Sequence, residues 1–172
     1  GVAGVYIHEK HARNTKLPRF AGWWGHNKEN RFRMDREFDV MPTAEGWQLS
    51  NAPILSMAAH KASLDIFAEA GMDQLHEKRK ALSAYLHFVL GDINDKLSTR
   101  SIELITPQDE KARGCQVSML LLEKGRDVFH ALTARGVITD WREPNVIRIA
   151  PVPLYNSFED IWQFGNIVSS IL

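Results

Sequence analysis

The sequence is poor in several features that would point to a particular class of protein. It contains one cysteine, Cys115, so no disulfide can form within the chain, and a lone thiol fits a reducing compartment. No run of apolar residues approaches the roughly 18 that a membrane-spanning helix requires. Basic and acidic residues number 21 each, which gives no electrostatic reason to bind nucleic acid or an anionic membrane. We therefore expect a cytoplasmic protein with neither kind of partner.

Several familiar catalytic motifs are also missing. The sequence has no glycine-rich phosphate loop and no Gly-x-Ser-x-Gly element. The segment His8-Glu9-Lys10-His11 lacks the i, i+4 histidine spacing of zinc proteases, so we predict no metal site there. The start, Gly1-Val2-Ala3-Gly4, has no methionine and none of the basic and apolar regions of a signal peptide. We expect the numbering to begin within a longer protein.

The first 49 residues show little regular pattern. Residues 2–8 form a short apolar run that predicts a buried strand. Residues 9–49 interleave basic and aromatic side chains without a period, and so long an irregular segment usually serves function or an interface. It contains Gly22-Trp23-Trp24-Gly25-His26. Adjacent tryptophans favour a core or subunit interface, but they can also offer a platform for a ring or an indole N–H to a phosphate.

Clear periodicities begin near residue 50. Apolar residues at helical spacing predict helices at 52–69 and 72–92, broken at Gly71. Ser50-Asn51 precedes the first helix and reads either as an N-cap or as part of a polar-ligand site at the helix start. From residue 98 the order strand, strand, helix, strand, strand, helix predicts a small α+β layer, with helices on one face of a mostly antiparallel sheet. Its expected elements are strands at 102–104, 115–121, 137–141 and 146–150 and helices at 126–134 and from 157.

Arg148 is the most unusual charged residue of these strands. It lies within Val146-Ile147-Arg148-Ile149-Ala150, where a guanidinium must find a partner or reach a cleft. One reading is an exposed edge arginine or an internal ion pair. The other is a fork that binds a carboxylate through two parallel hydrogen bonds. Composition and periodicity leave both open.

Six segments together resemble the kynureninase family. They occur in the family's order and spread over nearly the whole chain, and the last is long and specific. They are Ile7-His8-Glu9-Lys10-His11, Gly22-Trp23-Trp24-Gly25-His26, Arg33-Met34-Asp35, Ser50-Asn51-Ala52-Pro53-Ile54, Arg113-Gly114-Cys115-Gln116 and Arg148-Ile149-Ala150-Pro151-Val152-Pro153-Leu154-Tyr155-Asn156-Ser157. Ala52 departs from the pattern, because relatives often have a second proline there.

The resemblance implies the aspartate-aminotransferase type of fold. Residues 1–70 would then end the large cofactor domain and include its interface loop. Residues 71–97 would form a connecting helix, and residues 98–172 the small C-terminal domain. It also implies a homodimer whose active sites lie at the subunit boundary.

The resemblance further implies an activity and its residues. Kynureninases use pyridoxal 5'-phosphate to hydrolyse kynurenine or 3-hydroxykynurenine, in tryptophan catabolism, to alanine and anthranilate or 3-hydroxyanthranilate. By position Trp23 and Asn51 match cofactor-binding residues, and Arg148 matches the arginine that binds the substrate α-carboxylate. Asn51, Ser50 and His26 match residues near the substrate. Which of the two substrates is preferred stays open.

One part of the family pattern lies outside the sequence. The resemblance places the Schiff-base lysine a few residues before Gly1, and the ring-nitrogen aspartate and most phosphate ligands further upstream. We therefore expect the 172 residues alone to be inactive and to act with the upstream part of the same protein. The alternative is a non-catalytic module that dimerises or binds a carboxylate.

Overall fold

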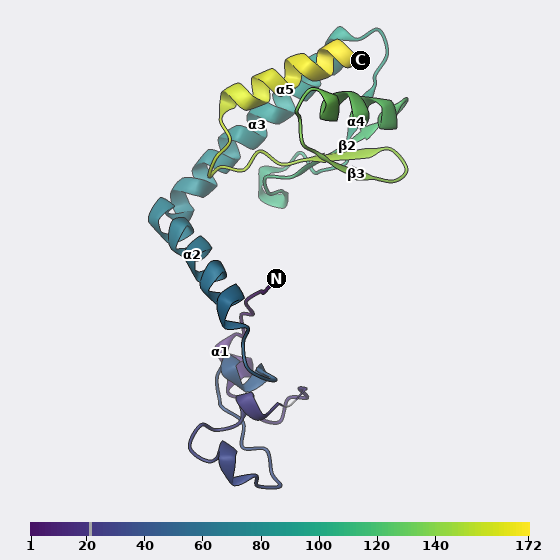
Figure 1. Cartoon of the computed structure of the whole chain (residues 1–172). Coiled ribbons are helices and arrows are strands. Elements are labelled where there is room, and N and C mark those ends of the chain that lie inside the picture. Colours follow the sequence, from purple (N-terminus) through teal and green to yellow (C-terminus); the bar gives the residue numbers. More distant parts are fainter. Residues whose placement is uncertain (21) are drawn as a thin grey trace. The chain divides into compact units, whose positions relative to one another are not determined.

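The computed structural model describes residues 1–172 apart from residue 21. The chain divides into two units, Gly1–Phe67 and Ala68–Leu172, each with its own internal contacts. Figure 1 shows the elements of both units.

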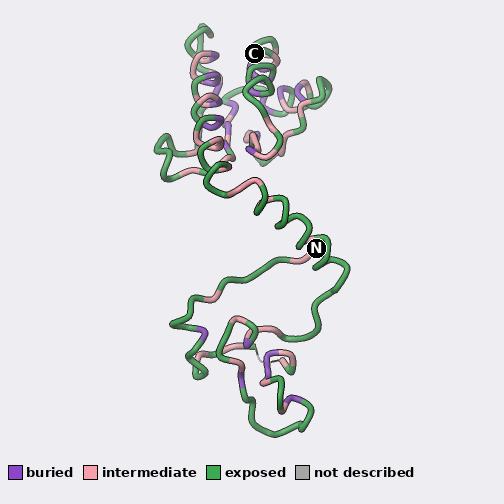
Figure 2. The backbone as a smooth tube through the Cα atoms, turned by 90° about the vertical axis from the view of Figure 1, so that its left-hand side faces the viewer, coloured by how far each residue is buried: buried purple, intermediate pink, exposed green. Residues whose placement is uncertain are grey.

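The first unit consists of short elements joined by long loops. Its elements are α1 (Glu9–Ala12), the 3-10 turns η1 (Trp23–Gly25), η2 (Arg31–Arg33) and η3 (Ala44–Trp47), and most of α2 (Ile54–Ala70). Few of its residues are buried (Figure 2). The expectation that residues 9–49 lack long regular elements is confirmed.

The strand predicted at residues 2–8 is wrong. These residues pair with no other described segment, and the side chain of Tyr6 is 82% exposed. An apolar run becomes a strand only where a second strand can satisfy its backbone groups. Helix α2 also starts later than predicted. The carbonyl of Pro53 accepts the first helical bond, from the N–H of Met57 at 2.9 Å, so Pro53 stands at the cap position instead of Ser50 or Asn51.

The second unit is an α+β layer. Its sheet has the order β1-β2-β4-β3 and is antiparallel throughout. The strands are β1 (Ile102–Leu104), β2 (Val117–Leu121), β3 (Asp140–Arg142) and β4 (Val146–Ile149), and the helices are α3 (Met72–Lys96), η4 (Glu110–Ala112), α4 (Gly125–Ala134) and α5 (Phe158–Ile171). The predicted fold class is confirmed, with helices and a small antiparallel sheet in one C-terminal unit.

The core of this unit lies between one face of the sheet and the helices. Val117, Met119 and Leu121 of β2 are fully buried, and they alternate with half-buried residues. Ile147 and Ile149 of β4 follow the same alternation. They pack with buried side chains of α3, α4 and α5, among them Leu86, Leu132 and Val168. Side chains at the alternate positions must therefore face the other way.

Local signals fix the ends of the helices. Gly71, with φ of 78°, separates α2 from α3, as its position in the sequence predicts. Ser157 caps α5: its hydroxyl accepts from the N–H of Asp160 at 3.2 Å, and the Asp160 carboxylate accepts from the N–H of Ser157 at 2.8 Å. This reciprocal pair is a capping box.

Candidate functional site

The register of the sheet sets the surroundings of Arg148. Arg148 of β4 lies directly opposite Asp140 of β3 on one side and Ser118 of β2 on the other. Arg148 and Ser118 alternate with the buried core residues of their strands, and residues paired directly across a sheet lie on the same face. All three side chains therefore share the face turned away from the core. Arg142 lies two residues beyond Asp140 and shares this face too.

Arg148 forms an ion pair with Asp140. Its Nε donates to Oδ2 of Asp140 at 2.8 Å, and its Nη2 donates to the same oxygen. A third donor, Nη2 of Arg142, lies 3.0 Å from that oxygen. The hydrogen bond from Arg148, followed by the charge of Arg142, lowers the pKa of Asp140 below its ordinary value. The ion-pair reading of Arg148 is thus confirmed.

The pair leaves part of the guanidinium free. Arginine carries five N–H donors, and Asp140 accepts from only Nε and Nη2. The other N–H groups of Arg148 donate to no residue that the structure describes, and its side chain is 32% exposed. Two arginines and one aspartate carry a net charge of about +1 at neutral pH. Ion pairing and binding of an external carboxylate are therefore compatible at this position.

A second predicted group of residues lies in the first unit, around Trp23. The Trp23 ring stands edge-on to the rings of Trp24 and Phe32, with centroids 5.4 and 5.5 Å away, and is 45% exposed. The side chain of Arg31 stabilises this loop from its interior. It is buried, donates to the carbonyls of Trp24 and His26 at 3.2 and 3.0 Å, and lies over the Trp24 ring.

The tryptophan loop packs on the chain just before Ser50. A Cβ at Gly22 would lie 2.0 Å from the carbonyl oxygen of Leu49, so only glycine permits this approach. The structure therefore brings the loop of Trp23 against the segment that leads into Ser50 and Asn51. Both of these residues are exposed, and neither side chain bonds to a described residue.

His26 differs from the other predicted residues because it is buried. Its side chain packs edge-on against Phe38, with ring centroids 5.5 Å apart, and its Nε2 finds no partner in the described part of the chain. Four predicted residues thus belong to the first unit, and Arg148 belongs to the second.

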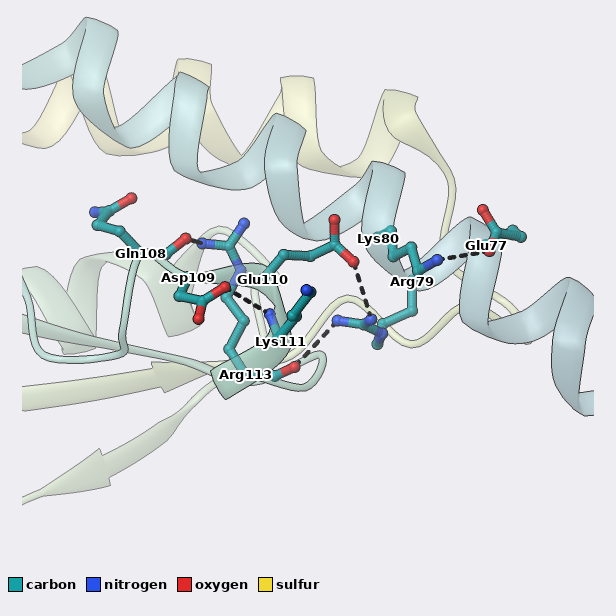
Figure 3. Close-up of polar contacts among 8 residues, drawn as sticks. All are labelled: Glu77, Arg79, Lys80, Gln108, Asp109, Glu110, Lys111 and Arg113. Carbon is teal, nitrogen blue, oxygen red and sulfur yellow. Dashed lines mark hydrogen bonds and ion pairs between the residues drawn. The ribbon is translucent and has the colours of Figure 1, made fainter.

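Sequence reasoning missed two features of the second unit. The first is Asp140, whose role depends on strand register. The second is a polar cluster between α3 and the β1–β2 loop (Figure 3). There Arg79 donates to the carbonyl of Arg113 at 3.1 Å and lies 3.6 Å from Glu110. Arg113 donates to the carbonyl of Gln108 at 2.7 Å. The contacts of Arg79 attach residues 107–113 to α3, and the bond of Arg113 joins two parts of this loop to each other.

Three further features of the described residues concern metal ligands, membrane spans and hollows. No three of their histidine, cysteine, aspartate or glutamate side chains gather as metal ligands. No helix among them combines the length and the apolar character needed to span a membrane. A hollow of about 590 Å³ between α5 and the segment before β3 is lined by residues such as Thr139 and Asn156, and Arg148 does not line it.

Comparison with known proteins gives concordant matches. A family model described as the kynureninase C-terminal domain matches residues 75–168. The kynureninases of Flavobacterium psychrophilum and Flavobacterium johnsoniae are each 53% identical over 166 residues, covering 96% of this chain and 39% of the relative. The kynureninase of Stenotrophomonas maltophilia is 48% identical over 172 residues, covering 98% of this chain and 40% of the relative. The chain thus spans about two fifths of the length of these curated relatives.

Proposed function

Because the chain belongs to the kynureninase family, we propose that it forms the C-terminal part of an enzyme that hydrolyses kynurenine or 3-hydroxykynurenine. The bond cleaved is the one between Cβ and Cγ, and the products are alanine and anthranilate or 3-hydroxyanthranilate. This reaction belongs to tryptophan catabolism. The proposal extends to a homodimer with active sites at the subunit boundary.

Pyridoxal 5'-phosphate is the cofactor that the family implies, and the first unit offers donors that fit it. The half-exposed indole of Trp23 and the exposed amide of Asn51, which bonds to no described residue, supply N–H groups for an anionic, polar ligand. We propose that these two residues hold part of the cofactor. When bound, the cofactor supplies an electron sink for breaking the carbon–carbon bond.

The single observation that best supports the proposal is the position of the Arg148 guanidinium and its pairing with Asp140. Its guanidinium lies on the sheet face turned away from the core, is fixed on one side by Asp140 and keeps free N–H groups. An amino-acid substrate presents a planar α-carboxylate, and arginine binds such a group through two parallel hydrogen bonds. We propose that Arg148 binds and orients that carboxylate. Ser50, Asn51 and His26 remain the proposed neighbours of the rest of the substrate.

The proposal is tested in the complete enzyme with Arg148→Ala and Arg148→Lys. Loss of a charge partner of a bound carboxylate costs about 2–5 kcal/mol in kcat/KM, so we expect Arg148→Ala to lower kcat/KM by about 30-fold or more. Arg148→Lys should also lower it, because an ammonium group cannot form the two-pronged contact. Glu143→Gln is the matched control, since Glu143 lies in the turn between β3 and β4 and pairs with Arg126 of α4, away from Arg148 in the pairing.

A pair of inhibitors makes the test specific. One is a kynurenine-like amino acid, and the other is the same amine without its α-carboxylate. Arg148→Ala should weaken binding of the inhibitor that carries the carboxylate and leave binding of the carboxylate-free inhibitor unchanged. An unchanged kcat/KM in both Arg148 variants would remove this residue from the substrate site.

The polypeptide of residues 1–172 supplies a second test. We propose that it has no turnover by itself, because the resemblance places the lysine that carries the cofactor outside these residues. The purified polypeptide is incubated with pyridoxal 5'-phosphate and kynurenine, and anthranilate is followed by its fluorescence. Turnover from a preparation whose intact mass shows only this polypeptide would contradict the proposal.

A further inference from the structure

The contact between Arg148 and Asp140 uses a particular edge of the guanidinium. A guanidinium can present two parallel N–H groups along its Nε–Nη2 edge or along its Nη1–Nη2 end. Asp140 occupies the Nε–Nη2 edge with a single oxygen, Oδ2. The Nη1–Nη2 end donates to no other described residue and can still receive a carboxylate with two oxygens.

From this geometry we infer that Asp140 is a positioning residue for substrate binding, which fixes the guanidinium of Arg148 so that its Nη1–Nη2 end is ready for the substrate α-carboxylate. The inference rests on the proposed function of Arg148. It adds a residue that acts on the substrate only through another side chain.

The strands make Asp140 well suited to this role. Asp140 and Arg148 are direct partners in the β3–β4 register, so two hydrogen-bonded backbones set the distance between them. A free arginine side chain has many rotamers and must lose that freedom when it binds a ligand. An aspartate that holds Nε already restricts the plane of the guanidinium before the ligand arrives.

The net charge of Asp140, Arg142 and Arg148 also supports a role for Asp140 in substrate binding. Oδ2 of Asp140 also lies 3.0 Å from Nη2 of Arg142, so one carboxylate offsets part of the charge of two guanidinium groups. A net charge of about +1 remains on the three side chains at neutral pH. One substrate carboxylate therefore brings this cluster to neutrality. Without Asp140, the two arginines would face each other without an intervening anion.

A competing role makes the opposite prediction. If Asp140 instead occupied the place of the substrate carboxylate, its removal would free Arg148 and lower KM. If it positions Arg148, its removal raises KM. The sign of the change in KM therefore separates the two roles.

The experiment uses the complete enzyme and the variants Asp140→Ala, Asp140→Asn, Arg148→Ala and the double variant Asp140→Ala/Arg148→Ala. Asp140→Asn keeps an oxygen that accepts from Nε but removes the charge. Glu143→Gln again serves as the control, because it removes a different ion pair, with Arg126 of α4, from the same hairpin. Initial rates give kcat and KM, and the two inhibitors with and without the carboxylate give binding constants. Thermal midpoints report the folding of each variant.

We expect Asp140→Ala to raise KM on the order of ten-fold, the effect of losing a hydrogen bond to a charged group, with a smaller change in kcat. Asp140→Asn should recover part of the loss. The carboxylate-free inhibitor should bind all variants alike. In the Arg148→Ala background, Asp140→Ala should have no further effect, because its action passes through Arg148. If Asp140→Ala does not fold, the same comparison is made with Asp140→Asn.

The possible outcomes separate this inference from the proposed function. If Arg148→Ala leaves KM unchanged, the proposed role of Arg148 fails and the inference fails with it. If Arg148→Ala raises KM but the Asp140 variants do not, or if they lower it, only the role of Asp140 is overturned. Equal effects of Asp140→Ala with and without Arg148 would likewise overturn it.

Discussion

Replacing Gly165 by alanine tests the packing of α5 on α3. Gly165 lies within α5, and a Cβ built on it would stand 2.4 Å from Cγ1 of Val89 in α3. Carbon atoms in contact are normally about 3.5–4.0 Å apart, so the two helices would be forced apart or Val89 would have to rotate. Valine in a helix strongly prefers one rotamer, so rotation is costly.

The expected magnitude follows from two opposing effects. Overpacking a well-filled core costs about 1–3 kcal/mol, whereas alanine is favoured over glycine inside a helix by about 0.8–1.0 kcal/mol. Gly165→Ala alone should therefore destabilise the chain by about 1 kcal/mol. In a Val89→Ala background the obstructing methyl group is absent, and the same change should stabilise by about 1 kcal/mol through the helix preference alone.

The assay is urea unfolding of the 172-residue polypeptide, followed by the circular dichroism of its helices. The four proteins of the cycle are the parent, Gly165→Ala, Val89→Ala and the double variant. The decisive quantity is the coupling free energy, which we expect at about 2 kcal/mol. If Gly165→Ala has the same effect in both backgrounds, within about 0.5 kcal/mol, α3 and α5 do not pack as closely as the structure shows.

Two further predictions concern the polar contacts of the second unit. Ser157→Ala should lower the free energy of unfolding by about 1 kcal/mol through loss of the N-cap. The N–H of Ser157 is the main cause of a lowered pKa of Asp160. The stabilisation that the ionised Asp160 supplies is therefore complete above the ordinary aspartate pKa of 3.8 and is lost as the pH falls through the lower pKa of the folded state. Urea unfolding from pH 2.5 to 6 should show a weaker acid dependence in Asp160→Asn. Arg79→Met should free residues 107–113 from α3, so their amide hydrogen exchange should become about ten-fold faster, and unchanged exchange there would mean that Arg79 does not restrain the loop.

The second unit could be predicted from its sequence because its signals are local. The alternation of Val117, Met119 and Leu121 defines β2, and helical spacing defines α3 and α5. Helix α3 runs to Lys96 rather than ending near residue 92, because polar residues such as Asp95 do not stop a helix on their own. The first unit offered no such period. Its loop is fixed instead by the buried Arg31, which donates to the carbonyls of Trp24 and His26. The close approach of Gly22 to Leu49 also fixes it, and this contact joins residues far apart in the sequence.

Asp140 was missed because its partner depends on register, which periodicity alone does not give. The sequence places Asp140 eight residues before Arg148, and only the pairing of Asp140 with Arg148 and of Arg142 with Val146 brings the two charges together. A slip of β3 by one residue would set Asp140 opposite Ile147 and turn it towards the core. An unpaired carboxylate there would be strongly disfavoured. The pair therefore selects the register of the β3–β4 hairpin, and the same register is what prepares Arg148 to bind a ligand.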